Sequence, residues 1–208
     1  MLLKQVVHRQ DEPIGDVYFP MGGAFSLVKR LGNGDAAEIA TIGSEGAIGA
    51  MVFFGQRIAE CDAMVQPVGP GAHVMGAARF IREMARRGAF FNRIIRYNQA
   101  LMSQIMQTIA CNGLHPAEQR CCRWLLMTHD RAGADEFAFT HEFLATMLGV
   151  RRPTVTLIAA TLQRRGLVEY GRGWVRIVDR PGLEAASCEC YQTVKAQMQR
   201  MLPELGAA

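Results

Sequence analysis

Long apolar runs are absent from this chain of 208 residues. Its longest apolar stretches, such as residues 46–55, are far shorter than the roughly 20 residues that a membrane-spanning helix needs. The first five residues, MLLKQ, do not begin the basic segment and long apolar core of a secretory signal. The sequence therefore predicts neither a membrane span nor export, and we expect a cytoplasmic protein.

Signs of catalysis are also absent. The chain shows no glycine-rich phosphate loop, no Ser/His/Asp order of a catalytic triad and no paired-carboxylate signature. We therefore expect that the protein is not an enzyme. Its composition, half hydrophobic and one fifth charged, is ordinary for a globular protein. The net charge of +4 is too small, by itself, to indicate a nucleic-acid partner.

The six cysteines and five histidines show no framework that indicates a common site. The cysteine spacing does not match a secreted disulfide framework, which favours a reduced, intracellular chain. Cys188 and Cys190 form a C-x-C pair and Cys121 is adjacent to Cys122, but the C-x-x-C pairs typical of zinc sites are missing. We therefore favour small buried apolar groups over metal or redox sites, and predict no metal and no cofactor.

Short strands are indicated over about the first 75 residues. β-branched or aromatic runs occupy residues 16–20, 24–28, 37–43 and 62–68, with glycine-rich turns between them. The segment LGNGD at 31–35 is a good hairpin signal, because Asn and Gly tolerate a positive φ. The spacing predicts a β-barrel or a jelly-roll-like module.

From about Ala77 the apolar spacing becomes helical. We expect a long helix over residues 90–111, about 30 Å in length, which Asn112 and Gly113 end. Such a helix belongs either to the core of its own chain or, as a connector between domains, to a dimer in which it pairs with its twin. A last helix with a frayed tail is expected over 181–202.

From His141 onward the sequence carries the pattern of a helix-turn-helix. Gly149 falls where the turn between the helices needs a left-handed residue, and Ala145 falls where the helices cross and only a small side chain fits. The inward apolar positions are Leu144, Leu148, Val155, Ile158 and Leu162. A plain helical hairpin does not need all of these residues at these offsets, so the pattern favours DNA binding.

Arg151, Arg152 and Pro153 stand at the start of the second helix. Proline is tolerated in a first helical turn, where its missing N–H would have no partner, and the free amides there suit a phosphate. Arginine can bind phosphate or read guanine through two parallel hydrogen bonds. Thr154 and Thr156 follow near the groove-facing side. We therefore expect this helix to enter the major groove of DNA.

Charge and the following hairpin support this interpretation. Seven arginines against two acidic residues give the stretch 151–180 a charge of +5, although a solvated helix face is the alternative. A β-hairpin bent at 171–173 makes the unit a winged helix-turn-helix, with Trp174 packed beneath the wing. Thr140 is a natural N-cap and a phosphate candidate. The predicted DNA-binding residues are Thr140, Arg151, Arg152, Thr154, Thr156 and Arg172.

The chain resembles the Crp/Fnr family of bacterial transcription regulators over nearly its whole length. DVYFPMGGAFSLV, EIATIGSEGAIG and LATMLGVRRPTVTLIAATLQRRGLVEYGRGWVRIVD carry the resemblance. The expected α+β fold has a β-roll sensor-like domain in 1–76, a helical connector and dimerisation helix in 77–113, and a winged helix-turn-helix with a helical tail in 114–208. The resemblance also implies a cyclic-nucleotide-binding-like β-roll, a homodimer on palindromic DNA, and recruitment or obstruction of RNA polymerase.

The chain departs from the family pattern in its sensor segment. Ala50 stands where the ribose-binding glutamate of cyclic-AMP-binding relatives is expected, and Cys61 and Asp62 stand near the place of their Arg-Ser pair. An aspartate repels a phosphate, so we expect that cyclic AMP is not bound in the usual way, unless Arg57 is displaced into that role. The effector is left open. No cysteine precedes Cys61, which argues against the iron–sulfur mechanism of the oxygen-sensing branch.

Two further departures concern the reading helix and the N-terminus. The best-known recognition helices begin Arg-Glu-Thr with a second arginine three residues later, whereas this chain has Arg152, Pro153, Thr154 and then Leu157. The β-roll also begins late, so we expect a shortened roll or a misassigned start. The sequence thus predicts a dimeric DNA-binding regulator; the alternative is a ligand- or redox-responsive binding module whose reading head is vestigial.

Overall fold

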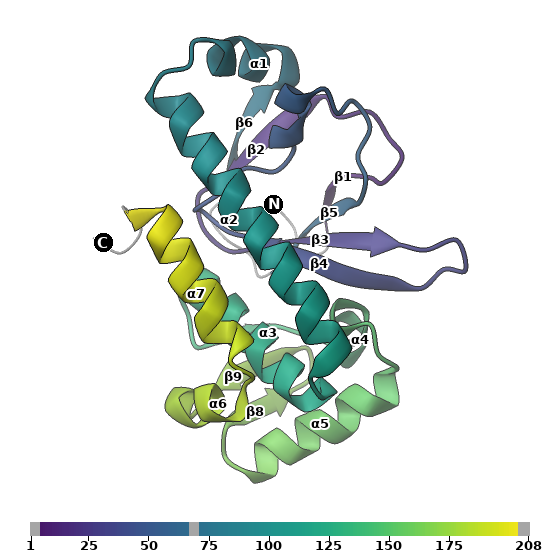
Figure 1. The fold of residues 1–208 in the computed structure, drawn as a ribbon. Helices are drawn as coiled ribbons and strands as arrows, with labels where there is room; N and C mark the ends of the chain where they lie inside the picture. The colour runs from purple at the N-terminus through teal and green to yellow at the C-terminus, as the bar shows by residue number, and fades with distance from the viewer. Residues whose placement is uncertain (1–4, 67–70, 204–208) are drawn as a thin grey trace.

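The computed structural model describes residues 5–66 and 71–203, and its N-terminal part is built from strands (Figure 1). The strands are β1 (Val6–His8), β2 (Asp16–Pro20), β3 (Phe25–Arg30), β4 (Ala36–Ile42), β5 (Asp62–Val65) and β6 (Ala72–Gly76), with a 3-10 helix, η1 (Ala50–Phe54), between β4 and β5. They form a four-stranded antiparallel sheet, β1-β5-β3-β4, and a separate pair, β2-β6. The strand-rich N-terminal module is confirmed; positions 67 and 68 of the last predicted run lie outside the described residues.

The hairpin between β3 and β4 forms where the sequence predicts it. Arg30 faces Ala36 across the pair, and the turn closes through the Leu31 N–H, which donates to the Asp35 carbonyl at 2.8 Å. The Asp35 N–H donates in turn to Asn33 Oδ1 at 3.0 Å. A short polar loop therefore satisfies its own backbone groups and fixes the register of the two longest strands of this sheet.

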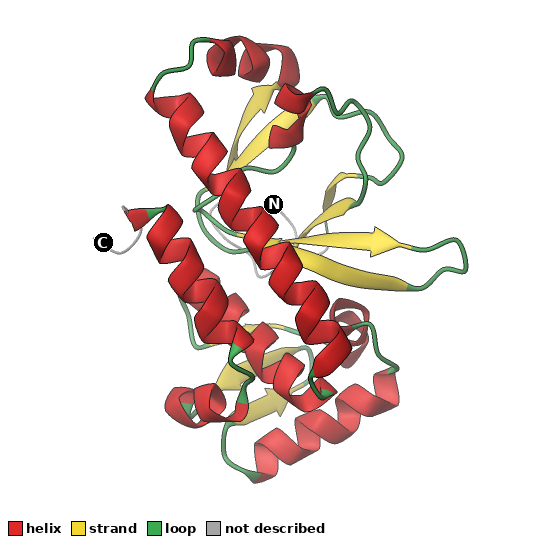
Figure 2. Cartoon of the chain, viewed as in Figure 1, coloured by secondary structure: helices red, strands yellow, loops and turns green. Residues whose placement is uncertain are grey.

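Helices make up most of the remaining chain (Figure 2). They are α1 (Ala77–Ala85), α2 (Ala89–Leu114), α3 (Ala117–Ala132), α4 (His141–Leu148), α5 (Arg152–Arg164), α6 (Arg180–Ala186) and α7 (Cys190–Met201). Strands β7 (Glu136–Ala138), β8 (Val168–Gly171) and β9 (Trp174–Ile177) form an antiparallel sheet of order β7-β9-β8. None of the helices in the described part of the chain is both long and apolar enough to span a membrane.

The long helix α2 runs past the predicted stop at Asn112 and Gly113 and ends at Leu114. Its C-cap is His115, whose backbone is extended because the next residue, Pro116, disfavours the helical conformation before it. The glycine-rich turn after β4 packs closely against α2: a Cβ on Gly46 would lie 2.3 Å from the buried Tyr97 ring. Glycine at this position lets the turn and the helix touch.

The single helix expected over 181–202 is wrong, because the chain forms two helices, α6 and α7, in that region. Ser187 is extended, and its hydroxyl donates to the Glu184 carbonyl at 2.8 Å, which competes with helix continuation. Leu202, the last residue of the expected helix, is completely buried in a core cluster with strand and α2 residues. From residue 204 onward, the frayed tail expected after it lies outside the described residues. Helix α7 thereby lies along α2, as Figure 1 shows.

A buried polar network joins the four-stranded sheet to the helices that follow α2. Glu38 of β4 accepts hydrogen bonds from Gln66 Nε2 at 2.8 Å and from Ser26 Oγ. Thr128 of α3 donates to Gln66 Oε1 at 3.3 Å, and the Ser26 hydroxyl also lies 3.2 Å from Met147 Sδ of α4. Burial raises the pKa of the Glu38 carboxyl. The network therefore fixes how the two halves of the chain sit on each other.

Candidate nucleic-acid interface

Helices α4 and α5 form the predicted helix-turn-helix. Thr140 caps α4, because its Oγ1 accepts a hydrogen bond from the Phe143 N–H at 3.1 Å. The turn passes through Gly149 at φ 61, where a side chain would be strained, and the Val150 N–H donates to the Ala145 carbonyl at 3.0 Å. Ala145 itself is buried, as expected for the position at which the two helices cross.

Helix α5 has one buried face and one exposed face. Its N-cap is Arg151, and Pro153 lies in its first turn. The buried residues Val155, Ile158, Ala159 and Leu162 pack into, or beside, the core that α3, α4 and the small sheet share. The exposed face contains Arg152, Thr156, Leu157, Ala160, Gln163 and Arg164. Core packing therefore holds α5 by one side and leaves the other free for a partner.

The structure brings several predicted site residues together at the start of α5. Arg151 and Arg152 are exposed there, and Thr156 lies one turn along, with its hydroxyl donating to the Arg152 carbonyl at 3.2 Å. Thr154 is only half-exposed, between the outward and inward faces. The Thr140 side chain is exposed but already serves as the N-cap of α4, whose first residue, His141, lies beside Thr156.

Arg172 is exposed at the tip of the β8–β9 hairpin, as predicted for a wing. The wing is tied to α5, since Gln163 Oε1 accepts a hydrogen bond from the Tyr170 N–H at 3.2 Å. Trp174 packs across Gly171, where an added Cβ would lie 2.1 Å from the indole ring. Trp174 is thus held against the hairpin, and only a glycine at position 171 leaves room for it.

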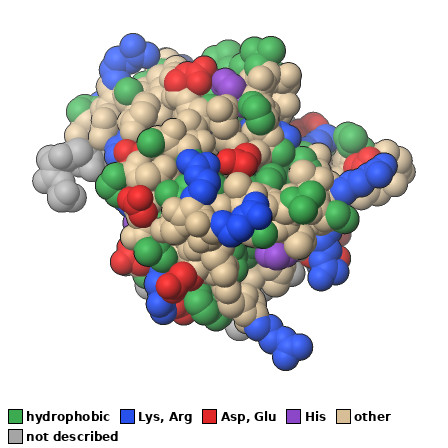
Figure 3. Space-filling view, turned by 90° about the horizontal axis from the view of Figure 1, so that it is seen from below, with side chains coloured by type: hydrophobic (Ala, Val, Ile, Leu, Met, Phe, Trp, Pro, Cys, Tyr) green, Lys and Arg blue, Asp and Glu red, His purple; other side chains and the backbone are tan. Residues whose placement is uncertain are grey.

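Only part of the basic stretch is available to a polyanion. Arg165 pairs with Glu118 at 3.0 Å, Arg176 with Glu136 and Glu169 at 2.6 and 3.2 Å, and Arg180 with Asp130 and Glu184 at 2.6 and 3.0 Å. Within the stretch 151–180, all of which the structure describes, the arginines without an ion pair are Arg151, Arg152, Arg164 and Arg172. Basic and acidic side chains are accordingly interspersed on the lower face of the molecule in Figure 3.

A groove beside α5 contains residues that the sequence prediction did not include. His141, Gln163 and Arg164 line it together with Thr156 and Tyr170. His141 Nδ1 lies 3.2 Å from Thr156 Oγ1, and partial burial, followed by the charge of Arg152, lowers the pKa of His141. The spacing of Thr156, Gln163 and Arg164 along one helical face is the sequence signal that identifies these positions.

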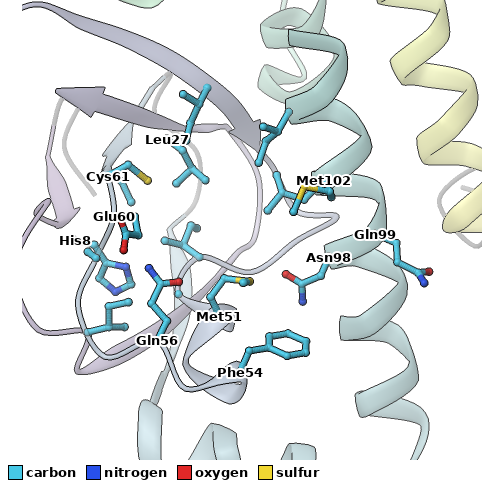
Figure 4. Close-up of a pocket in the computed structure, with 18 of the residues that line it drawn as sticks. His8, Leu27, Met51, Phe54, Gln56, Glu60, Cys61, Asn98, Gln99 and Met102 are labelled. Carbon is cyan, nitrogen blue, oxygen red and sulfur yellow. The ribbon is translucent and has the colours of Figure 1, made fainter. Parts of the chain in front are cut away.

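A second feature is a cavity of about 530 Å³ between the β-roll, η1 and α2 (Figure 4). Its wall is mostly apolar, and none of the described residues that line it is a lysine or an arginine. Arg57 is not among the lining residues, and its Nη1 lies 3.5 Å from the Val52 carbonyl. Cys61 does line the cavity, and burial raises the pKa of its thiol to about 11.

Along the chain a strand-rich module, a long helix and a winged helix-turn-helix follow one another. Residues 119–186 match the family model of the Crp-like helix-turn-helix domain. A comparison with curated proteins found no match. The chain thus contains a Crp-like helix-turn-helix domain and has the fold of CRP/FNR-family transcriptional regulators.

Solved structures of this fold cover most of the chain. TTHB099, a CRP-family regulator from Thermus thermophilus, is 20% identical with a TM-score of 0.75 and matches 90% of this chain and 95% of its own. FixK2 from Bradyrhizobium japonicum is 17% identical with a TM-score of 0.74, covering 89% and 94%. TTHA1359, a CRP/FNR-family regulator that is also from Thermus thermophilus, is 18% identical with a TM-score of 0.65, covering 90% and 96%.

Proposed function

We propose that this protein is a homodimeric, sequence-specific DNA-binding regulator that places α5 of each protomer in the major groove. The observation that carries the proposal is the start of α5, where Arg151 and Arg152 are exposed and free of ion pairs among the described residues. Buried residues on the opposite face hold the helix rigidly. A rigid helix with unpaired guanidinium groups at its N-terminus suits recognition of base edges and phosphates.

Each residue of this surface receives a role. Arg152 reads guanine, and Thr156 lies near the same base pairs. Leu157, which is 71% exposed, is an apolar side chain suited to a thymine methyl group. Outside α5, Arg172 on the wing contacts the phosphate backbone, as does the start of α4 at Thr140. Arg151 and Thr154 add contacts at the N-terminus of α5.

The dimer forms through α2. Along this helix Met102, Met106 and Ile109 are 54%, 57% and 68% exposed, and their spacing places them on one stripe. A stripe of exposed apolar side chains on a long helix suits a second copy of the same helix. Residues 1–76 then act as the sensor half, 77–113 as connector and dimer contact, and 114–208 as reading head and tail. In the dimer the two reading heads bind half-sites of a palindrome whose centres lie about 34 Å apart.

Replacing Arg152 with alanine tests the reading role. The variant is expected to lose about 1–3 kcal/mol of binding free energy on the protein's preferred duplex and to tolerate any base at one position of each half-site. Binding is measured by fluorescence anisotropy on the specific duplex, a duplex substituted at that position and a random duplex. Arg176→Ala, which removes an arginine already paired with two glutamates, is the matched control and should bind as the parent does. Equal affinity of parent and Arg152→Ala for all three duplexes would refute the assignment.

Salt dependence separates this proposal from a binding module with a vestigial head. A protein that contacts several phosphates loses affinity steeply as salt rises, because counterions are released on binding. The parent is expected to show this steep dependence on its specific duplex. Weak binding with a shallow dependence would instead support the vestigial head, and the cavity would then be the main functional site.

The cavity beside α2 is the proposed effector site, and it suits an uncharged, largely apolar molecule. Cyclic AMP carries a negatively charged phosphate. Among the described residues that line the cavity, none is a lysine or an arginine that could neutralise this charge. We therefore expect no heat of binding when cyclic AMP is titrated calorimetrically at micromolar concentration into protein that binds DNA in a parallel assay. Saturable binding of cyclic AMP at that concentration would contradict this expectation.

A further inference from the structure

Four potential metal ligands that lie far apart in the sequence meet where α2 and α7 touch. Cys111 and His115 are one helical turn apart at the C-terminal end of α2, and Cys188 and Cys190 flank the N-terminus of α7. Their ligand atoms all lie within 4.8 Å of one another. The three cysteines are buried and His115 is half-buried, so the cluster is largely shielded from water.

The distances within this cluster fit a single ion. Cys111 Sγ lies 3.5 Å from Cys188 Sγ, and Cys190 Sγ lies 3.5 Å from His115 Nδ1. Tetrahedral zinc with bonds of about 2.3 Å to sulfur and 2.0 Å to nitrogen places its ligand atoms about 3.5–3.8 Å apart. An iron–sulfur cluster inserts several atoms between its thiolates and needs a wider arrangement. The observed spacing therefore favours one tetrahedral ion.

The surroundings of the cluster also suit a metal centre. His115 directs Nδ1 at the cysteines, while its Nε2 lies 3.3 Å from Glu189 Oε1, as in the carboxylate–histidine–metal arrangement. Gln107 Nε2 donates to Cys190 Sγ at 3.0 Å, so a second polar group supports a ligand. A disulfide between two of the cysteines would use neither the histidine nor this carboxylate.

A buried cation lies next to the cluster. Arg123 of α3 is 6% exposed and donates to Thr108 Oγ1, one turn before Cys111, at 2.9 Å. Three thiolates and a neutral imidazole around a divalent ion carry one net negative charge, which a neighbouring guanidinium offsets.

We propose that Cys111, His115, Cys188 and Cys190 bind one Zn²⁺ ion that fastens α7 to α2. Three sulfur donors and one nitrogen select zinc over hard cations such as Mg²⁺ and Ca²⁺, and four protein ligands close the site, so its role is structural. The ion sits at the end of the proposed dimerisation helix, just before the reading head begins. The sequence alone does not identify the residues that complete the site with Cys188 and Cys190, because Cys111 and His115 lie about 75 residues earlier, at the end of α2.

Metal analysis of the full-length protein, purified under reducing conditions, tests this site. We expect close to one zinc per chain by plasma mass spectrometry in the parent. Cys190→Ala and His115→Ala should lose most of it, and Cys122→Ala, which removes an equally buried thiol outside the cluster, should retain it. A chelator should lower the Tm of the parent and leave that of Cys190→Ala unchanged.

Cobalt replacement keeps the test decisive even where a variant fails to fold. Co²⁺ added to reduced, metal-free parent should produce the intense visible bands of a tetrahedral ion and a sulfur-to-cobalt charge-transfer band. The proposal is overturned if the parent contains no zinc and Co²⁺ gives only the weak spectrum of a six-coordinate ion. A Cys111–Cys188 disulfide, detected by peptide mapping in protein purified under reducing conditions, would overturn the proposal as well.

Discussion

Replacing Met106 with lysine is expected to convert the dimer into monomers and to weaken binding to a palindromic duplex at least about 100-fold, or roughly 3 kcal/mol. Met106 lies in the middle of the exposed apolar stripe of α2, between Met102 and Ile109. In a two-fold interface the change occurs twice, so two ammonium groups would be buried near each other without partners. Each monomer would then bind only one half-site.

Sedimentation equilibrium and DNA binding measure this effect on the same samples. Leu31→Lys is the matched control, because Leu31 is an exposed apolar residue of similar accessibility, 59%, at the tip of the β3–β4 hairpin and away from α2. The control is expected to stay dimeric and to bind as the parent does. If Met106→Lys remains a dimer at the concentrations where the parent is one, α2 is not the dimer contact.

Removing Arg131 is expected to destabilise the fold by about 3–5 kcal/mol. Arg131 of α3 donates through Nη2 and Nε to Glu45 Oε1 at 2.7 and 3.0 Å, and through Nη1 to the Met127 carbonyl at 3.0 Å. The side chains of Arg131 and Glu45 are only 12% and 10% exposed. Arg131→Met would leave the Glu45 carboxylate largely buried without the Arg131 guanidinium, at the contact between the β-roll half and the reading head.

Urea unfolding followed by circular dichroism gives the free energy of unfolding for this test. The double variant Arg131→Met with Glu45→Leu should recover much of the loss, because no unpaired charge remains. Arg176→Met serves as the comparison, since it breaks ion pairs that are exposed to solvent and should leave stability nearly unchanged. A smaller loss for Arg131→Met than for Arg176→Met would show that the buried pair does not join the two halves.

Local signals explain why the reading head could be predicted from the sequence. The Thr140 cap, the left-handed Gly149 and Pro153 in the first turn of α5 each depend on a few neighbouring residues, and all three are observed. The same holds for the turn at 31–35 and for the wing at 171–173. Capping, turn and proline rules operate over short distances, so the sequence alone contains the information that they need.

The remaining features depend on contacts between distant segments. The charge of +5 calculated for the stretch 151–180 includes Arg165, Arg176 and Arg180. Only the folded chain shows that these three arginines pair with acidic side chains, most of which lie outside that stretch. The return of α7 along α2 likewise cannot be read from either helix separately, yet it brings Cys188 within 3.5 Å of Cys111. Tertiary pairing of this kind leaves no periodic signal in the chain.

Selection of bound sequences from a pool of random duplexes tests the central claim, that two α5 helices of a dimer read one palindromic site. The parent protein is expected to enrich two inverted half-sites whose centres lie about one helical turn, or 34 Å, apart, each with a guanine whose enrichment disappears in Arg152→Ala. Enrichment of no sequence, or of one isolated half-site, would contradict the account.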